Sequence, residues 1–385
     1  MKKFVCLICL IMITKYTLAQ GWEEVYSGSS FDLDAIHFID ESIGYAAGGF
    51  TDILRTTDGG ATWATTDDIG ARDFSFYDSE VGYSASRVGE SMAKTVNGGV
   101  TWTAITPVNG NSLWGVATVS PTTAYFVGTG GVLWRTTNSG QSFTILNSGT
   151  SNLITDIFFT SEQVGYLTAQ LTGLRKTTNG GSSWTTIWTG NSSTEMHFVT
   201  EQIGYVVGPQ GRIIKTTDAG ANWEQLVTNS NDILFGVHFY DINHGIVVGS
   251  GGTILYTNDA GLTWDRQETG ISLLLNDVRM LSPTSAVVVG DNDTILKNDN
   301  IVLSVADNDI QNVNVFPNPA SNSIKVNSDS FIEHIKIYNV LGQEVASYSV
   351  QEFTKELDIS NLSDGNYFLK VYSGKAVHVI RFIKI

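Results

Sequence analysis

The chain has 385 residues, of which 38 are Asp or Glu and 22 are Lys or Arg, giving a net charge of −16. A chain this acidic is repelled by nucleic acids and by anionic membrane surfaces, which disfavours both as partners. The acidic excess lies in residues 20–300, which hold 29 acidic and 12 basic residues. The two cysteines, Cys6 and Cys9, precede this segment, so the rest of the chain offers neither a disulfide nor a thiolate metal site.

The first nineteen residues have the pattern of a cleavable signal peptide. Lys2 and Lys3 precede an apolar run, residues 4–13, and residues 17–19 end in a small-residue cleavage pattern. The apolar run is too short to span a bilayer, so we predict that residues 1–19 are removed. No later segment is apolar enough for a membrane helix, and we therefore expect no transmembrane segment.

A repeat of about 40 residues dominates residues 20–300. Its most regular part is the pattern Thr-x-Asp/Asn-x-Gly-x-x-aromatic, which occurs six times. The aromatic residues that end the six copies are Trp63, Trp102, Phe143, Trp184, Trp223 and Trp264. Successive aromatics are 39, 41, 41, 39 and 41 residues apart, a period typical of four-stranded propeller blades.

A second motif indicates how the repeat closes. A Gly-Tyr pair or a close variant precedes each copy of the Thr-to-aromatic pattern, which we call the box. A seventh copy of the Gly-Tyr motif, Ala286-Val287, has no complete box after it. The missing aromatic lies at the other end of the chain, because Trp22 precedes Trp63 by 41 residues. We therefore predict that residues 22–26 form the outer strand of the last blade, which closes a ring of seven blades and protects its edges.

Each unit reads as four short strands separated by turns rich in Gly and Asn, and no segment keeps a helical period. In the first unit we expect strands at residues 35–39, 44–47, 52–56 and 63–66. The predicted fold class is therefore all-β, a seven-bladed β-propeller over residues 20–300 followed by a small C-terminal β-sandwich.

The boxes themselves are predicted to be structural. The Thr hydroxyl and the Asp or Asn side chain can bond the backbone of a tight turn, and the Gly permits a positive φ. The acidic or amide positions of the six boxes are Asp58, Asn97, Asn138, Asn179, Asp218 and Asp259. Because half of them are Asn, a shared catalytic or metal-binding role is disfavoured.

These boxes resemble the Asp-box (BNR) repeats of sialidase-like propellers. The fuller unit, best seen in residues 237–245, 252–255 and 259–264, resembles the propeller family of photosystem II stability and assembly factors. The resemblance covers roughly residues 22–300 and implies the fold. It says little about activity, because propellers host many functions.

The C-terminal segment differs in pattern. Residues 301–312 read as a polar, acidic linker, and residues 313–385 read as short alternating strands that predict a β-sandwich. This domain resembles the type A sorting domain of the type IX secretion system. The residues that carry the sorting motif are Pro317, Asn318, Pro319, Gly342 and Gly365.

The sorting resemblance implies a Bacteroidota-type cell and transport across the outer membrane by the type IX machinery. It also implies that a sortase-like peptidase removes the domain, leaving the mature protein extracellular or on the outer cell surface. A carbohydrate-binding sandwich is the alternative that the fold alone would allow.

Ligands of propellers usually bind the face opposite the boxes, and the first strand of each blade lines the central channel. Two consecutive positions near the start of that strand form two predicted rings. The first ring comprises Asp34, Arg72, Trp114, Thr155, Thr194, Phe235 and Asn276. The second ring comprises Ala35, Asp73, Gly115, Asp156, Glu195, Gly236 and Asp277.

The first ring is chemically varied, as a specific binding surface would be, and the second is acidic enough to attract cations. The alternative is that both rings bond open strand ends and face water. The candidates for ligand contact on this face are Arg72, Arg87, Trp114 and Arg212.

Three histidines and a set of basic residues also recur. His37, His197 and His238 share one repeat position, but they belong to the first, fifth and sixth blades, so convergence on one metal ion is disfavoured. The basic residues that precede the boxes are expected to form a solvated face: Arg55, Lys94, Arg135, Lys176, Lys215 and Lys297. We predict no metal and no cofactor.

The leading functional hypothesis is a monomeric, non-catalytic, exported propeller that binds an extracellular protein or glycan. The alternative is a secreted glycoside hydrolase that uses Asp73 and Asp156, whose carboxyl groups would have to lie about 5–9 Å apart. A sialidase-type site is disfavoured because only Arg72 and Arg279 fall on the inner strand. A structural adhesin with little specificity is a third possibility.

Overall fold

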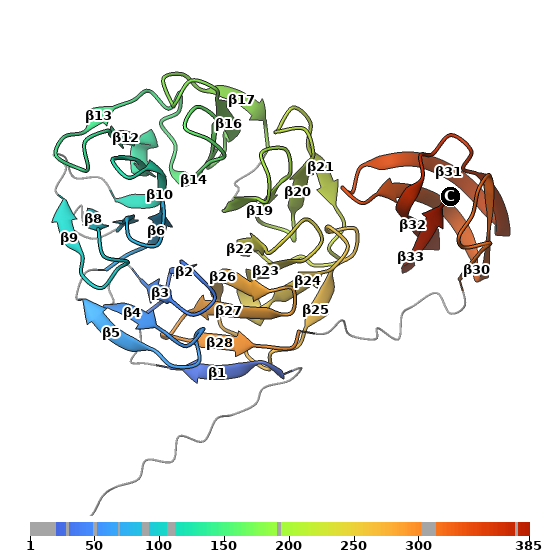
Figure 1. Cartoon of the computed structure of the whole chain (residues 1–385), viewed down its shortest axis with the longest axis horizontal. Helices are drawn as coiled ribbons and strands as arrows, with labels where there is room; N and C mark the ends of the chain where they lie inside the picture. The colour runs from blue at the N-terminus through green and yellow to red at the C-terminus, as the bar shows by residue number, and fades with distance from the viewer. Residues whose placement is uncertain are drawn as a thin grey trace, which may run out of the picture.

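The computed structural model describes residues 21–27, 31–48, 52–67, 70–86, 92–105, 112–190, 194–301, 313–373 and 376–385. Within these residues it is built from seven four-stranded sheets arranged in a ring and one five-stranded sheet beside the ring (Figure 1). The predicted fold class is therefore confirmed. The expected signal peptide, the candidate Arg87 and nearly all of the expected linker lie outside the described residues.

The first six blades are each formed by four consecutive antiparallel strands, with the first strand at the channel and the fourth at the outside (Figure 1). Blades 1 and 2 comprise β2 (Ala35–Phe38), β3 (Gly44–Ala47), β4 (Ile53–Thr56), β5 (Ala64–Asp67), β6 (Asp73–Phe76), β7 (Gly82–Ala85), β8 (Met92–Thr95) and β9 (Thr103–Ile105). Blades 3 and 4 comprise β10 (Leu113–Ser120), β11 (Thr123–Gly128), β12 (Leu133–Thr136), β13 (Thr144–Ile145), β14 (Ile154–Phe159), β15 (Gly165–Ala169), β16 (Gly173–Thr177) and β17 (Thr185–Trp188). Blades 5 and 6 comprise β18 (Met196–Phe198), β19 (Gly204–Val207), β20 (Ile213–Thr216), β21 (Glu224–Leu226), β22 (Leu234–Phe239), β23 (Gly245–Gly249), β24 (Ile254–Thr257) and β25 (Asp265–Gln267). Short 3₁₀ turns, η2 (Thr129–Gly131) and η3 (Ser250–Gly252), connect the second and third strands of blades 3 and 6.

The seventh blade combines both ends of the propeller. Its strands are β26 (Leu275–Ser282), β27 (Ser285–Gly290), β28 (Ile295–Asn298) and β1 (Glu23–Tyr26). β1 pairs antiparallel with β28, with Glu23 opposite Lys297. The Trp22 side chain is fully buried and packs in one cluster with Val248 and Leu296. The N-terminal strand thus closes the ring as predicted.

The hydrophobic core lies between adjacent blades rather than at the centre of the ring. One cluster, for example, joins Tyr45 and Ile53 of blade 1 to Phe74 and Trp102 of blade 2. The Gly of the Gly-Tyr motif makes this packing possible. A Cβ atom on Gly44 would lie 2.6 Å from the Phe38 ring, so only glycine leaves room for that aromatic side chain.

The Asp-box turns lie between the third and fourth strands of blades 1–6, and we call these six turns the box rim. In blade 1 the Thr56 hydroxyl accepts a 2.9 Å hydrogen bond from the Gly60 N–H and donates to Asp58 at 2.8 Å. The same Asp58 oxygen accepts the Thr62 N–H at 2.9 Å. In blade 2 the Asn97 side-chain oxygen makes the corresponding bond with the Thr101 N–H at 3.0 Å. Each of these contacts satisfies the turn itself.

The basic residues beside the boxes do not form the solvated face that the sequence led us to expect. Lys176 donates to the Ala219 carbonyl of the next blade at 2.7 Å, and its ammonium group lies 5.4 Å from the Tyr166 ring centroid. The Tyr166 hydroxyl donates to that same carbonyl at 2.9 Å. Lys215 repeats this contact with the Ala260 carbonyl at 3.0 Å, so these two lysine side chains connect neighbouring blades.

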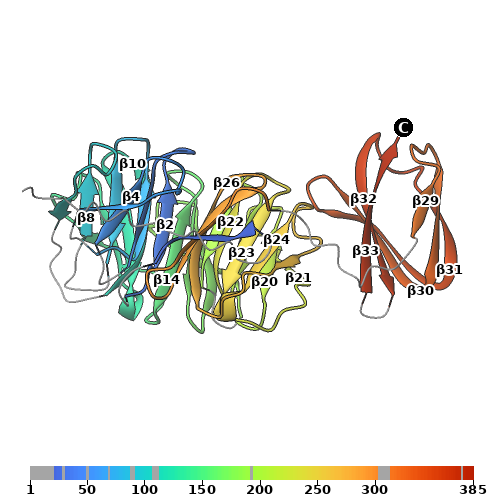
Figure 2. The same ribbon diagram turned by 90° about the horizontal axis from the view of Figure 1, so that it is seen from below.

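The C-terminal domain is one five-stranded sheet that bends around its own core (Figure 2). Its strands are β29 (Asn314–Phe316), β30 (Ser323–Asn339), β31 (Glu344–Asp358), β32 (Gly365–Ser373) and β33 (Ala376–Lys384). The sequence predicts short strands here, whereas β30 is one long strand whose pairing with β31 shifts register between Asn327 and His334. This irregularity allows one strand to serve both layers of the expected sandwich.

The sorting-motif residues lie at turns and strand ends of this domain. The Asn318 side chain donates to the Arg381 carbonyl at 3.0 Å and accepts the Ile383 N–H at 2.9 Å, which fastens the Pro-Asn-Pro segment to β33. Gly342 has a φ of 72° in the turn that ends β30. The domain contacts the box rim of blade 6, where buried Lys370 donates to the Leu262 carbonyl.

Candidate functional site

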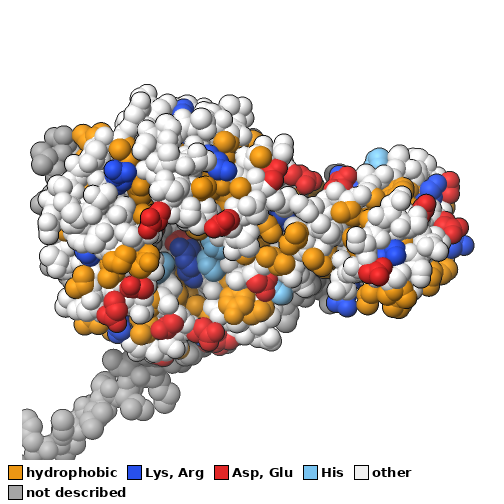
Figure 3. Space-filling model, turned by 45° about the horizontal axis from the view of Figure 1, so that its top comes forward, with side chains coloured by type: hydrophobic (Ala, Val, Ile, Leu, Met, Phe, Trp, Pro, Cys, Tyr) orange, Lys and Arg blue, Asp and Glu red, His pale blue; other side chains and the backbone are white. Residues whose placement is uncertain are grey.

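A cavity of about 750 Å³ occupies the central channel, and we call it the funnel. All seven residues of the first predicted ring line it, so every blade contributes a side chain to its wall. Figure 3 looks into the hollow, where Arg and His side chains lie at depth and acidic side chains surround the opening. The funnel is therefore the place where blade-specific side chains converge.

The candidate contact residues do not all reach the funnel. Arg72 and Trp114 line it together, with the guanidinium carbon of Arg72 3.6 Å from the Trp114 ring centroid. Arg72 also forms a 2.7 Å ion pair with Asp34, so its orientation is set from two sides. Arg212 does not line the cavity, and its guanidinium instead lies 5.2 Å from the Trp188 ring centroid.

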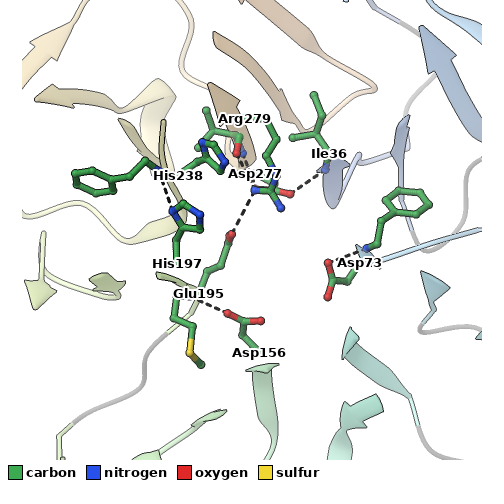
Figure 4. A network of polar contacts seen from close by, with 12 residues as sticks. Ile36, Asp73, Asp156, Glu195, His197, His238, Asp277 and Arg279 are labelled. Carbon is green, nitrogen blue, oxygen red and sulfur yellow. Dashed lines mark hydrogen bonds and ion pairs between the residues drawn. The ribbon is translucent and has the colours of Figure 1, made fainter. Parts of the chain in front are cut away.

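Below this level, three aspartates of the second ring join neighbouring blades. Oδ2 of Asp73 accepts the Val116 N–H at 2.8 Å, and Oδ1 accepts the N–H of the following residue at 2.7 Å. Asp156 binds the Met196 N–H in the same way at 2.8 Å, and Asp277 binds the Ile36 N–H at 2.8 Å. Each carboxylate thus satisfies open strand ends on two blades. Figure 4 shows the contact between Asp277 and Ile36.

Two ring positions hold glycine where the first strands approach more closely. A Cβ on Gly236 would lie 2.9 Å from the Cα of Asp277, and one on Gly115 would lie 3.3 Å from the Cα of Asp156. The ring therefore contains carboxylates that connect blades by hydrogen bonds and glycines that permit close approach of the backbones.

Glu195 and Arg279 form the centre of the funnel floor. A guanidinium nitrogen of Arg279 lies 3.3 Å from Asp277 and 3.8 Å from Glu195, and it donates to the Val278 carbonyl at 2.9 Å. In Figure 4 the Glu195 side chain points across the channel toward Arg279. Both side chains line the cavity, so both are available to a ligand that enters it.

The three histidines pack into the wall around this floor. Nδ1 of His197 accepts the Phe239 N–H at 3.0 Å, and Nδ1 of His238 accepts the Met280 N–H at 3.2 Å. The two rings stack with centroids 4.5 Å apart, whereas His37 stacks on Phe76. These histidines join neighbouring blades through their rings, which commits two of the three Nδ1 atoms to backbone donors.

Burial controls protonation in the funnel. Desolvation, and after it repulsion between the positive charge of Arg279 and a protonated ring, lowers the pKa of His37 and of His197 to about 3. Desolvation raises the pKa of Asp156 to about 6 in spite of its backbone hydrogen bonds. Burial also raises the pKa of Asp73 and of Glu195, with the neighbouring carboxylates adding to the effect. The histidines are therefore neutral. Desolvation and like-charge repulsion make it harder for the carboxyl groups of the floor to ionise.

The arrangement has clear chemical consequences. The floor can accept hydrogen bonds from a cationic group, and such a group would lower the pKa of the surrounding carboxyls. Asp73 and Asp156, the residues of the hydrolase alternative, already use both of their oxygens for backbone N–H groups. Among the described residues, no group of three or more His, Asp or Glu side chains is arranged to hold a metal ion.

Family models match parts of both the propeller and the C-terminal domain. Residues 143–231, 186–266 and 221–312 match the model described as photosynthesis system II assembly factor YCF48. Residues 314–385 match the secretion system C-terminal sorting domain. Both resemblances expected from the motifs are thus confirmed, and the C-terminal domain marks the chain for export to the cell surface or the extracellular space. No curated protein is similar enough in sequence to count as a match.

Solved structures define the fold class. The structure described as YCF48 bound to D1 peptide is 18% identical, with a TM-score of 0.60 over 74% of this chain and 99% of that one. The GH74 enzyme of Niastella koreensis is 15% identical, with a TM-score of 0.63 over 94% and 74% of the two chains. PorZ, a surface component of the type IX secretion system of Porphyromonas gingivalis, is 12% identical, with a TM-score of 0.55 over 94% and 60%. At these identities the likeness shows a propeller fold and no more.

The two predicted rings located the funnel, and the alternative expectation, that ring residues bond open strand ends, holds for Asp73, Asp156 and Asp277. The blade-to-blade bonds of Asp73, Asp156 and Asp277 follow from pairings with residues of another blade, which no local pattern reveals. The only signal available was the repeat phase itself, which aligned the ring positions.

In the described part of the chain, no helix is long and apolar enough to cross a membrane.

Proposed function

We propose that this chain is an exported, non-catalytic propeller that binds a segment of an extracellular protein in the funnel. The observation that carries the proposal is the convergence of seven first-ring side chains of six types, one from each blade, on a single cavity of about 750 Å³. Repeated side chains would indicate a purely structural channel, whereas this variety is typical of a recognition surface.

The funnel suits a protein segment better than a glycan. Sugar rings commonly stack on open aromatic faces, but the Arg72 guanidinium covers one face of the Trp114 ring at 3.6 Å. The mixture of carboxylates, one stacked guanidinium and partly exposed apolar side chains such as Leu274 fits the varied chemistry of a peptide. The similarity to a propeller described as bound to a peptide agrees with this choice.

The hydrolase alternative is weaker because its proposed carboxyls are engaged elsewhere. Asp73 and Asp156 each bind two backbone N–H groups, which holds their oxygens toward the strand ends. A general acid or nucleophile needs an oxygen free to meet the substrate. The similarity to GH74 enzymes concerns the fold, so we assign no catalytic role to either residue.

Export supplies the cellular setting of the proposal. Residues 1–19 would direct the chain to the periplasm of a Bacteroidota-type cell, and the C-terminal domain would engage the type IX machinery. A sortase-like peptidase would then remove that domain, leaving a monomeric propeller released or attached at the surface. Detection of the propeller outside the cell, and its loss from that fraction when residues 313–385 are deleted, would test this part.

Binding can be tested with the purified chain lacking residues 1–19. We expect a displayed random-peptide library to yield specific binders and a glycan array to yield none. Arg72→Ala should weaken peptide binding at least about tenfold, which corresponds to 1.4 kcal/mol. Arg266→Ala is the matched control, because Arg266 pairs with Asp232 outside the funnel.

Two outcomes would contradict the proposed function. One is glycan binding without peptide binding. The other is release of product from a polysaccharide that disappears in Asp73→Asn or Asp156→Asn, which would favour the hydrolase.

A further inference from the structure

We infer that the funnel selects a long cationic side chain, that of lysine or arginine, and that Glu195 on the floor binds its charged group. The inference rests on the proposed function, because it names the kind of residue that the bound protein segment would insert. It also assigns Glu195 a role different from that of the other carboxylates around it.

Glu195 differs from its ring neighbours in what its carboxylate contacts. The other three ring carboxylates each accept two backbone N–H bonds and are held at the wall, as described above for Asp73, Asp156 and Asp277. Among the described residues, no backbone N–H donates to the Glu195 carboxylate, and its Oε1 atom lies 3.8 Å from Nη1 of Arg279. That separation is longer than a hydrogen bond, so the Glu195 oxygens retain capacity for a donor from a ligand.

The balance of charge indicates the sign of that ligand. Of the described residues that line the funnel, seven are Asp or Glu and two are Arg. One of these arginines, Arg72, is paired with Asp34 at 2.7 Å, and the other, Arg279, lies closest to Asp277 at 3.3 Å. Since burial keeps the three histidines neutral, they add no positive charge. The unbalanced carboxylates favour a cation and repel an anionic group.

The walls between mouth and floor indicate the length of the ligand side chain. Trp114 and Phe235, both of the first ring, line the cavity on different blades and add apolar surface to its wall. Lysine and arginine combine an aliphatic stem with a terminal charge, so they can cover such surface while their charged group reaches the acidic end. A short cation would leave the apolar wall uncovered.

Binding of this group should be linked to pH. The charged groups that act on Glu195 are Asp73 on β6, Asp156 on β14, and Asp277 and Arg279 on β26. The rings of His37, His197 and His238, on β2, β18 and β22, lie close enough to Arg279 to be affected by its charge. A bound cation favours the charged form of each carboxyl and lowers its pKa, so binding releases protons. With the pKa of Asp156 at about 6 in the free protein, affinity should rise as the pH increases from 5 to 8.

The test uses small probes and the full chain lacking residues 1–19. The probes are Nα-acetyl-lysine-N-methylamide, its arginine analogue, and the neutral norleucine analogue, which keeps the stem but lacks the charge. We expect the lysine or arginine probe to bind with a Kd on the order of 1 mM, at least about tenfold more tightly than norleucine, as measured by NMR titration. The affinity should be higher at pH 8 than at pH 5.

The matched variants are Glu195→Gln and Glu201→Gln, which make the same change of charge in the funnel and on the exposed surface. Glu195→Gln should weaken the cationic probe at least about tenfold and leave norleucine unchanged, whereas Glu201→Gln should alter neither. Equal binding of lysine and norleucine by the wild type would overturn the inference without any variant. Undiminished lysine binding by folded Glu195→Gln would also overturn it. In either case the proposed function would stand as long as library peptides still bind and Arg72→Ala weakens them.

Discussion

The box rim and the funnel are two sets of side chains that recur with the same period on opposite parts of the blades, and they differ in how completely their polar groups are satisfied. On the rim, each Thr, Asp or Asn bonds within its own turn, and side chains such as Lys176, Tyr166 and Lys215 bond carbonyls of the next blade. In the funnel, residue types change from blade to blade, and acidic groups outnumber basic ones.

The difference separates stability from recognition. A side chain whose bonds are complete within the fold has nothing left to offer a ligand, which explains why the regular rim residues read as structural. Side chains that vary and retain unused acceptors, such as Glu195, are the ones that can discriminate between ligands. Regularity along the sequence and completeness of hydrogen bonding therefore lead to the same conclusion.

The largest expected effect concerns the closing strand, on which the whole ring depends. Trp22→Ala removes a fully buried side chain between blades 6 and 7 and should lower the free energy of unfolding by about 3–5 kcal/mol. Urea unfolding of the purified propeller would measure the change. A loss below about 1 kcal/mol would contradict the packing described for β1.

The next effect tests whether the box rim is structural. Thr216→Val keeps the shape of the side chain but removes the acceptor for the Gly220 N–H, which lies 2.8 Å from the Thr216 hydroxyl oxygen. The buried N–H is left unsatisfied, so we expect a loss of about 1–3 kcal/mol in stability. Ligand binding in the funnel should not change. Weaker binding in a variant that remains folded would break the separation between rim and funnel.

The pH dependence of stability tests the funnel side of the comparison between the box rim and the funnel. The pKa of Asp156 is about 6 in the folded chain and 3.8 for the ordinary group, so protonation favours the folded state. This contribution is present below pH 4 and is lost as the pH rises through 6. Asp156→Asn lacks it, so the stability difference between wild type and variant should shift by about 2–3 kcal/mol between pH 4 and pH 7. Denaturant titrations over this range would reveal a pH-independent difference if the carboxyl were unperturbed.

The smallest effect is expected where the rim residues are interchangeable. Asn97→Asp retains the oxygen that accepts the Thr101 N–H, and Asp58 already fills the equivalent position in blade 1. The free energy of unfolding should change by less than about 0.5 kcal/mol. A change several times larger would show that the boxes are not equivalent turns.

Most of the fold could be predicted because its determinants are local and repeated. The expected strand at residues 44–47 coincides with β3, and the one at residues 52–56 differs from β4 by one residue. The closing role of Trp22 was predictable because its spacing keeps the phase of the boxes. The β-sandwich strands were less accurate, since β30 is one long strand whose bend depends on pairing with β31 rather than on a turn signal.

The candidate site was predictable in position but not in chemistry. Repeat phase placed Arg72 and Trp114 in the funnel, whereas Arg212, chosen for its type and loop position, lies beside Trp188 instead. The hydrogen bond from the Ile36 N–H to Asp277 joins residues 241 positions apart, so no local sequence pattern predicts it. Nor does the sequence show that Glu195, within the described residues, is the ring carboxylate that accepts no backbone N–H.

One measurement addresses the central claim directly: the pKa values of Glu195 and Asp156, followed by carboxyl-carbon NMR with and without the lysine probe. The free protein should show both groups titrating above their ordinary range, with Asp156 near pH 6. Saturation with the probe should lower both pKa values, because the bound ammonium group favours the charged carboxylates. Ordinary pKa values in the free protein, or values that the probe leaves unchanged, would contradict a funnel built to receive a cation.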